Sequence, residues 1–321
     1  MRGANKMKIT ILDKIAMGDD TPFYILDSIG EVTTYSNTSP EEAVSHIADS
    51  EVIVINKVKI TSDIICKCEK LKLICVFATG FDNVDVSTAK KHGVAVCNVP
   101  GYSTDSVALF TVATVLSLVS HLGEYNNFVR SGSYTKSGAS NKITPVFHEL
   151  RGKTWGIIGA GNIGTAVLKI AEAFGARVIV NKRTPSEEYE CVDIDTLCRE
   201  SDIITIHCPL NDSTRELINK ERIATMKKDV ILVNEARGAV LNERDVTEAV
   251  KAGRIAAFGC DVYSVEPFSQ QHPYNEIKDF DNVILTPHSA WGAYEARARC
   301  MKIIAENIKS YFSGGMLNRV D

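Results

Sequence analysis

Residues 154–164 read TWGIIGAGNIG, an apolar run that passes directly into a glycine-rich turn and then into a stretch with helical spacing. In this context Gly159 permits a tight turn, Gly161 lets the backbone approach a pyrophosphate, and Gly164 lets helix and strand pack closely. The helix N-terminus would present unpaired N–H groups to the phosphates. A glycine-rich turn that binds nothing is the alternative, but the strand–turn–helix context favours a dinucleotide site.

Apolar runs and helical stretches alternate on both sides of this turn. The expected strands are Lys8–Leu12, Glu51–Asn56, Leu73–Phe77, Val94–Asn98, Thr154–Ile158, Arg177–Asn181, Ile203–His207, Val230–Asn234, Ala256–Cys260 and Val283–Thr286. The expected helices are Ser39–Ala48, Thr61–Lys70, Val86–His92, Ser103–Arg130, Ile163–Phe174, Asp193–Glu200, Lys220–Thr225, Glu243–Ala252 and Tyr294–Phe312. Such alternation indicates right-handed βαβ units and parallel sheets, hence an α/β fold. The chain of 321 residues favours about two domains.

Composition and charge exclude several classes of protein. The formal net charge is −4, and no basic run is present, which argues against a nucleic-acid or anionic membrane surface as partner. The N-terminal sequence is too polar for a signal peptide or a membrane span. Nine cysteines include no C-x-x-C pair, so we expect reduced thiols in a cytoplasmic protein and no metal site.

The end of the strand that follows the glycine turn bears on the choice of cofactor. NAD sites usually carry Asp or Glu there, about 20 residues beyond the glycines, to hold the ribose diol. This chain has Asn181, Lys182 and Arg183 instead. The two cations could neutralise a 2′-phosphate, which favours NADP over NAD. Alternatively, both are solvated turn residues.

Three segments each place a reactive polar side chain at the end of an apolar strand, the edge where α/β sheets bind ligands. They contain Arg237, Glu266 and His288. Hydride transfer to a 2-keto acid needs a cation for the carboxylate, ideally Arg. It also needs a proton donor for the carbonyl oxygen, which suits a His that a carboxylate orients and keeps charged. Singly, each residue could be structural: an ion pair, a turn residue before proline, a loop histidine.

In these motifs the chain resembles the D-isomer-specific 2-hydroxyacid dehydrogenases along nearly its whole length. The matching segments are Ala78–Asp85, the glycine turn, Asn234–Gly238, Asp261–Pro267 and Pro287–Trp291. The resemblance implies two doubly wound, Rossmann-like parallel-sheet domains. A flavodoxin-like catalytic, substrate-binding domain would comprise residues 1–101 and 288–321, and an NAD(P)-binding Rossmann domain would comprise residues 102–287.

The same resemblance implies roles for further residues. Backbone N–H groups of Thr79 and Gly80 would hold the substrate carboxylate beside Arg237, with Asn98 and Trp291 also at the substrate. Cofactor contacts would come from Gly159, Gly161, Asn162, Ile163, Gly164, Asn181, Lys182, Arg183, His207, Pro209, Thr214, Ala236 and Asp261, the last near the nicotinamide amide. The helix and the polar, Gly/Ser-rich arm after it would form a two-fold homodimer through residues 103–145, although an intramolecular core helix is the alternative.

Within the family the chain looks most like the glycerate dehydrogenase or hydroxypyruvate (glyoxylate) reductase branch, on stretches such as Cys97–Thr104. It departs from that branch at Leu109, Phe110 and Glu235, and the glutamate is expected to add negative charge near Arg237. A D-lactate-type dehydrogenase is an alternative within the family. A nucleotide-sensing corepressor on the same fold is an alternative of another class. Glu266 argues against formate dehydrogenases, which have glutamine there.

Overall fold

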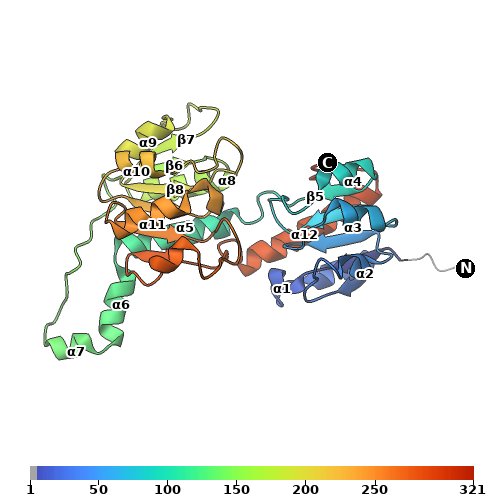
Figure 1. Ribbon diagram of the computed structural model, residues 1–321, viewed down its shortest axis with the longest axis horizontal. Helices are drawn as coiled ribbons and strands as arrows, with labels where there is room; N and C mark the ends of the chain where they lie inside the picture. Colours follow the sequence, from blue (N-terminus) through green and yellow to red (C-terminus); the bar gives the residue numbers. More distant parts are fainter. Residues whose placement is uncertain (1–5) are drawn as a thin grey trace, which may run out of the picture. The chain divides into compact units, whose positions relative to one another are not determined.

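The structure is a computed structural model that describes residues 6–321. The chain forms two compact units (Figure 1). The first unit contains the residues up to Ser103 and Gly292–Asp321, and the second unit contains Thr104–Trp291. The boundaries lie two to four residues from those expected, so His288 belongs to the second unit and not to the first.

The first unit is built on a parallel sheet with the strand order β2-β1-β3-β4-β5. The strands are β1 (Lys8–Ile11), β2 (Glu31–Thr34), β3 (Val52–Ile55), β4 (Leu73–Val76) and β5 (Ala95–Cys97). The helices are α1 (Lys14–Met17), η1 (Phe23–Ser28), α2 (Ala43–Ile47), α3 (Ser62–Lys67), α4 (Val86–Lys91) and α12 (Tyr294–Phe312). The order 2-1-3-4-5 is the flavodoxin-like one, as the resemblance implied.

The second unit contains a six-stranded parallel sheet in the order β11-β10-β9-β8-β6-β7. The strands are β6 (Thr154–Ile158), β7 (Arg177–Asn181), β8 (Ile203–Ile206), β9 (Ile231–Asn234), β10 (Ala257–Cys260) and β11 (Val283–Leu285). The helices are α5 (Thr104–Val119), α6 (Leu122–Arg130), α7 (Ser133–Ser137), α8 (Asn162–Ala173), α9 (Ile194–Glu200), α10 (Lys220–Thr225), η2 (Gly238–Val240), α11 (Glu243–Lys251) and η3 (Pro273–Glu276).

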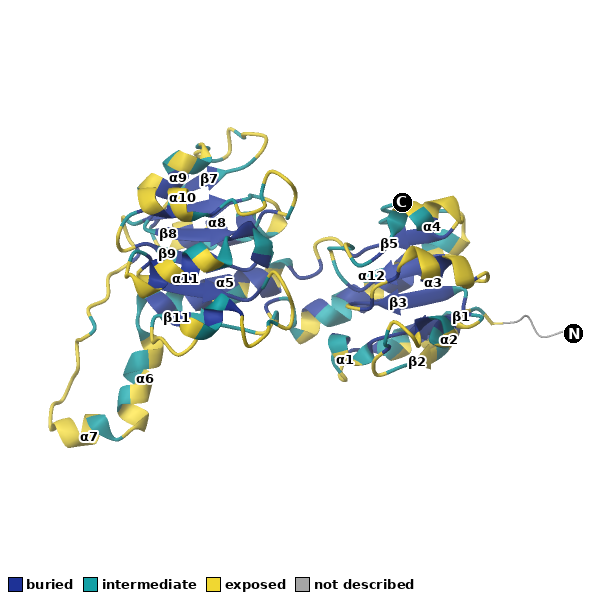
Figure 2. Ribbon diagram, in the orientation of Figure 1, coloured by how far each residue is buried: buried dark blue, intermediate teal, exposed yellow. Residues whose placement is uncertain are grey.

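Central strands are buried on both faces, which parallel sheets require (Figure 2). Every residue of β3, β4, β6, β8 and β10 is buried. In the second unit α5 packs with α8 and contacts β9, β10 and β11, while α9, α10 and α11 contact one another in series. Gly259 matters here because a Cβ at this position would lie 2.5 Å from the Thr114 side chain of α5.

Three local expectations were wrong or incomplete. The stretch before α2 contains a strand, β2, which its mostly exposed residues disguise. The expected helix Ser103–Arg130 is two helices, because the chain bends by 65° after α5 and His121 takes a left-handed φ of 51°. The following Ser131–Ile143 arm includes the short helix α7. In Figure 1, α6 and α7 extend away from the rest of the second unit.

Two features of the whole chain bear on its class. Among the described residues, no single helix is long and apolar enough to cross a membrane; the bent pair α5 and α6 passes such a test only when taken together. All nine cysteines are free thiols, and only Cys66 is exposed. Burial raises the pKa of most of the others, for example that of Cys97 to about 11.

Candidate active site

Arg237, Glu266 and His288 follow three neighbouring strands of the second unit. The segments that carry them begin at the carboxyl ends of β9, β10 and β11 respectively. β10 pairs in parallel with both β9 and β11, so the three segments emerge at one edge of the sheet. This is the edge at which α/β sheets bind ligands.

Glu266 and His288 form a direct pair. Nδ1 of His288 lies 2.6 Å from Oε2 of Glu266, and each side chain is 27% exposed. Because an ionised carboxylate only accepts, Nδ1 is the donor in this bond. The other carboxylate oxygen, Oε1, accepts the backbone N–H of Tyr263 at 3.1 Å. The imidazole is thereby oriented by a carboxylate that is itself held by the backbone.

His288 sits in a constrained turn. Its φ of 54° is in the left-handed region, which non-glycine residues adopt rarely and which clusters at functional sites. The carboxylate of Asp261 holds this turn: it accepts the Thr286 hydroxyl at 2.6 Å and the backbone N–H groups of Ser289 and Ala290, each at 2.9 Å. In the structure Asp261 therefore positions the segment that carries His288.

Arg237 projects from a tight turn that Asn234 shapes. The Asn234 side chain accepts the N–H of Ala236 at 3.1 Å and donates to the carbonyl of Arg237 at 3.0 Å. One guanidinium nitrogen donates to the Ala236 carbonyl at 2.8 Å. No carboxylate forms an ion pair with Arg237 within residues 6–321, so the cation retains donors for an anionic ligand.

Gly238 brings the Arg237 turn against the segment that carries Glu266. A Cβ on Gly238 would lie 2.0 Å from the carbonyl carbon of Tyr263 and 2.2 Å from the nitrogen of Ser264. Only glycine permits this approach of two backbones. The arginine and the Glu266–His288 pair thus belong to one packed assembly.

Glu235 does not behave as expected. It is buried, with 8% of its surface exposed, and burial together with the charge of Asp261 raises its pKa to about 9. No well-formed hydrogen bond reaches either carboxyl oxygen among the described residues, although the Thr114 side chain partly opposes the shift. The group is therefore protonated at neutral pH, and the expected negative charge near Arg237 is absent.

His207 is partly buried at this edge, and both of its ring nitrogens are buried. It follows β8, which pairs with β9, and burial lowers its pKa to about 3, so its ring is neutral. Neither ring nitrogen has a hydrogen-bond partner among the described residues. Sequence reasoning assigned His207 to the cofactor, but gave no indication that both ring nitrogens would be buried.

The glycine turn fits the diphosphate of a dinucleotide. Gly159 has a φ of 93°, and a Cβ there would lie 2.7 Å from the nitrogen of Cys208; one on Gly164 would lie 2.0 Å from the carbonyl oxygen of Gly159. Gly161, by contrast, faces open space just before α8, beside Asn162 and Ile163. The turn lies between β6 and β8, where the strand order reverses, which is the ligand crevice of such sheets.

The expected 2′ end of the cofactor site contains cations and no carboxylate. Asn181 ends β7 and donates to the Val192 carbonyl at 3.1 Å. Nζ of Lys182 lies 5.7 Å from the centre of the Tyr189 ring, and Arg183 is exposed. In the loop that follows β8, the Thr214 hydroxyl donates to the carbonyl of Pro209 at 2.7 Å. This bond holds the two residues together in one turn of the loop.

The expected substrate residues of the first unit also lie at strand ends. Thr79 and Gly80 follow β4, and Asn98 follows β5, its neighbour in the sheet. The Asn98 side chain donates to the Thr79 carbonyl at 2.7 Å, and the Thr79 hydroxyl donates to the Val99 carbonyl at 3.1 Å. Trp291 ends the second unit, directly after the turn that Asp261 holds.

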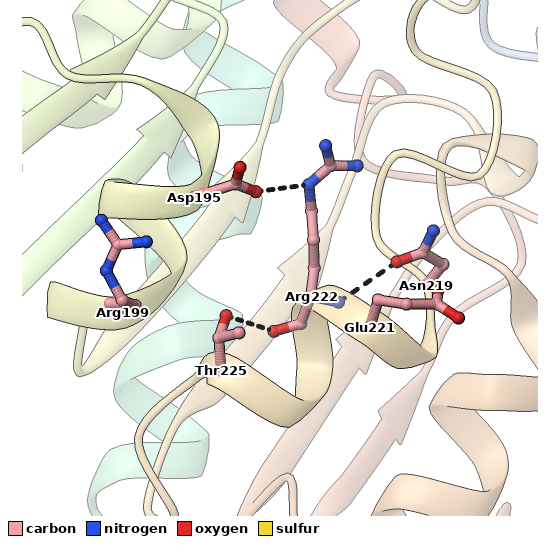
Figure 3. Close-up of a pocket in the computed structure, with 6 residues that line it drawn as sticks. All are labelled: Asp195, Arg199, Asn219, Glu221, Arg222 and Thr225. Carbon is pink, nitrogen blue, oxygen red and sulfur yellow. Dashed lines mark hydrogen bonds and ion pairs between the residues drawn. The ribbon is translucent and has the colours of Figure 1, made fainter.

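A surface hollow lies elsewhere in the second unit. Figure 3 shows this hollow of about 360 Å³, which six residues from α9, α10 and the residue before α10 line: Asp195, Arg199, Asn219, Glu221, Arg222 and Thr225. Arg222 already pairs with Asp195 at 3.0 Å and donates to the Leu217 carbonyl, and Arg199 donates to Thr196. No histidine lines the hollow, so it lacks the proton donor that the proposed keto-acid chemistry needs. Among the described residues no cluster of His, Cys, Asp and Glu could hold a metal ion.

Comparisons with known proteins agree with this arrangement. A family model described as "D-isomer specific 2-hydroxyacid dehydrogenase, NAD binding domain" matches residues 112–290. A hydroxypyruvate reductase of Blautia hydrogenotrophica is 37% identical over 98% of this chain and 100% of its own length. A glycerate dehydrogenase of Methylorubrum extorquens is 34% identical over 91% of this chain and 92% of its own.

Solved structures show the same fold. An acyclic imino acid reductase in complex with NADPH and D-Arg has a TM-score of 0.87 and 31% identity over 98% of this chain and 100% of its own. A D-lactate dehydrogenase of Aquifex aeolicus, complexed with NAD and lactic acid, has a TM-score of 0.85 and 29% identity over 98% of each chain. With the glycine turn and the strand-end residues in place, the chain belongs to the NAD(P)-dependent D-isomer-specific 2-hydroxyacid dehydrogenase family.

Proposed function

We propose that the protein reduces a small 2-keto acid, hydroxypyruvate or glyoxylate first, to the D-2-hydroxy acid. The observation that carries the proposal is the 2.6 Å pair between His288 and Glu266, which lies at the same sheet edge as the segment after β9 that carries Arg237. Relatives named hydroxypyruvate reductase and glycerate dehydrogenase support this branch of the family. A D-lactate-type activity is the second candidate, supported by structural neighbours with that name.

In the proposed reaction the guanidinium of Arg237 holds the keto-acid carboxylate, with the Thr79 and Gly80 N–H groups, Asn98 and Trp291 proposed as further substrate contacts. Glu266 holds His288 through Nδ1, so the proton for the carbonyl oxygen is carried on Nε2. A bound NAD(P)H supplies the hydride. In the reverse direction neutral His288 accepts the proton from the hydroxyl group.

The cofactor would lie along the glycine turn, over α8. Its diphosphate would face Gly161 and the N–H groups of Asn162 and Ile163, since a Cβ at Gly161 meets nothing within 4 Å. The loop of Pro209 and Thr214, together with His207, Ala236 and Asp261, would line the remainder. Because the residues after β7 are Lys182 and Arg183, we propose a preference for NADPH.

The test of the proposed function is a kinetic panel with hydroxypyruvate, glyoxylate and pyruvate, each with NADH and NADPH. His288→Ala should lower kcat about 1,000-fold while cofactor still binds, since general acid catalysis contributes 10²–10⁴-fold. The control is His92→Ala, which removes an exposed histidine of the first unit. Near-normal turnover in His288→Ala would refute the assignment. A protein that binds NAD(P)H but reduces no keto acid would favour the corepressor-like alternative.

Cofactor choice has its own test. Lys182→Ala combined with Arg183→Ala should weaken NADPH binding about tenfold or more and leave NADH binding nearly unchanged, because only the 2′-phosphate needs the cations. Fluorescence titration with each reduced cofactor measures both constants. Equal losses for both cofactors would show that the two residues have no role in discrimination.

We further propose a homodimer through residues 103–145, with a second copy covering the arm. Large apolar side chains are exposed along the helices and loop after α5: Leu122, Val129, Tyr134, Ile143, Val146 and Phe147. Exposed apolar surface of this extent is typical of an interface. Light scattering should give twice the chain mass, and Leu122→Asp with Val129→Asp should give a monomer.

We also propose a cytoplasmic location, because the free thiols suit a reducing compartment.

A further inference from the structure

The segment that carries Glu266 has no regular structure of its own. Between the end of β10 at Cys260 and η3, which begins at Pro273, the backbone forms neither helix nor strand. A segment of this length on a protein surface is normally mobile. Yet Glu266 must stay within hydrogen-bond distance of His288. Other parts of the second unit must therefore fix the segment.

Glu243, the first residue of α11, reaches into this segment. Its Oε1 accepts the backbone N–H of Ser264 at 2.8 Å, and its Oε2 accepts the Ser264 hydroxyl at a short distance. Ser264 is two residues before Glu266. The carboxylate also lies at a helix N-terminus, where negative charge is favourable.

His272 holds the far end of the segment to the same carboxylate. Its Nε2 lies 3.0 Å from Oε2 of Glu243, and the two side chains are only 7% and 10% exposed. Its Nδ1 accepts the backbone N–H of Tyr274 at 3.2 Å, so the proton of the neutral ring is on Nε2. Glu243 therefore accepts three hydrogen bonds, two from Ser264 and one from His272.

Packing reinforces these bonds on the inner side of the segment. The His272 ring contacts Phe268 and Tyr274, with ring centroids 4.7 and 4.8 Å apart. The Tyr263 ring contacts Phe268 at 4.7 Å, and its hydroxyl donates to the Thr286 carbonyl, two residues before His288, at 2.7 Å. Position 263 also provides the N–H that Glu266 accepts.

We infer that Glu243 is a positioning residue: with His272 it clamps the Glu266 segment against the Gly238 backbone and so sets the place of Glu266 relative to His288 and Arg237. The inference rests on the proposed role of Glu266 and His288. Within residues 6–321 Glu243 forms no hydrogen bond with Glu266 or His288, and it acts through Ser264 and the backbone of the segment.

The test compares Glu243→Gln with Glu276→Gln. Glu276 of η3 binds Arg244 and Lys251 of α11, so its replacement breaks ion pairs of α11 without touching the segment. Glu243→Gln replaces one acceptor by an N–H₂ group that faces donors. It should raise amide hydrogen exchange at residues 263–266 at least tenfold and lower kcat about 10- to 100-fold. Glu276→Gln should leave both within twofold, and NADPH affinity should stay within twofold in both variants.

Ser264→Ala is a milder variant that keeps the backbone bond and removes the hydroxyl bond. It should lower kcat by a smaller factor than Glu243→Gln, and it serves if Glu243→Gln does not fold. Wild-type exchange and wild-type kcat in the Glu243 variant would overturn the inference, as would equal losses of kcat in Glu243→Gln and Glu276→Gln. If the wild-type enzyme reduces no keto acid, the proposed function fails, and the exchange measurement still decides whether Glu243 holds the segment.

Discussion

The two units share a plan but use its ligand crevice in opposite ways. Each sheet reverses its strand order beside its first strand, between β1 and β3 in the first unit and between β6 and β8 in the second. In the second unit glycines follow β6, and Gly161 faces open space. In the first unit Asp13 follows β1, and its buried carboxylate accepts the N–H groups of Asn56, Lys57 and Val58.

The difference shows how one fold position becomes either a binding site or a structural contact. Backbone N–H groups at a crevice attract an anion in both units. In the first unit the chain supplies that anion itself, at 2.5 to 3.1 Å, and the crevice is closed. In the second unit the absence of a side chain at Gly161 leaves room for an external phosphate. Topology alone therefore did not determine which unit binds the cofactor.

The largest effect on stability should come from removing the Asp13 carboxylate, which closes the crevice of the first unit. Asp13→Ala would leave three buried N–H groups without a partner, and each unsatisfied group costs about 1–3 kcal/mol. We expect a loss of about 4 kcal/mol in the free energy of unfolding of the first unit, in line with these values. Hydrogen exchange should show the loss in β1 and β3 and not in β6 and β8. An unchanged first unit would mean that the carboxylate does not close the crevice.

The second-largest effect should come from blocking the crevice of the second unit, where the cofactor diphosphate is proposed to bind. Gly161→Val places a side chain in open space, so the fold should survive, but the side chain would occupy the phosphate position. We expect cofactor affinity to fall about 100-fold, equivalent to about 3 kcal/mol at 1.4 kcal/mol per factor of ten. Gly253→Val is the control at another open glycine, and valine at its positive φ of 64° strains the backbone, so this variant should lose stability but keep cofactor affinity. Unchanged NADPH titration with Gly161→Val would place the diphosphate elsewhere.

A smaller effect on the free energy of unfolding should show whether the buried Glu235 is neutral or ionised. The pKa of Glu235 is about 9 in the folded protein and near 4.5 when unfolded. Between these values only the unfolded chain releases the proton, so stability falls as pH rises from about 4.5 to 9 and then levels off. Glu235→Gln lacks this dependence. Denaturation at pH 5 and pH 6.5 should show the variant gaining about 2 kcal/mol relative to wild type at the higher pH. Parallel pH profiles would show that Glu235 is ionised.

Much of the fold could be predicted because local pattern and tertiary structure agree. β6, β7, α10 and α12 have the expected bounds. β2 was missed because an edge strand with exposed side chains lacks an apolar run. The bend after α5 was missed because a left-handed histidine leaves no trace in hydrophobic spacing.

The candidate site also has features that the sequence could predict and features that only the folded structure shows. Strand-end position and residue type point to Arg237, Glu266 and His288 as candidates. They could not reveal that Glu235 is protonated, because that depends on burial against α5 and on the charge of Asp261. Nor could they reveal the three bonds that Glu243 accepts, since Ser264 and His272 meet it only in the folded chain.

The distribution of aromatic and thiol groups provides an independent optical probe for each unit. Both tryptophans, Trp155 and Trp291, lie in the second unit, so intrinsic fluorescence is sensitive to that unit. Cys66, on α3 of the first unit, is the exposed cysteine, and a thiol-reactive dye should therefore label it first. The unfolding of each unit can thus be followed separately in the native sequence, by tryptophan fluorescence for the second unit and by dye fluorescence for the first.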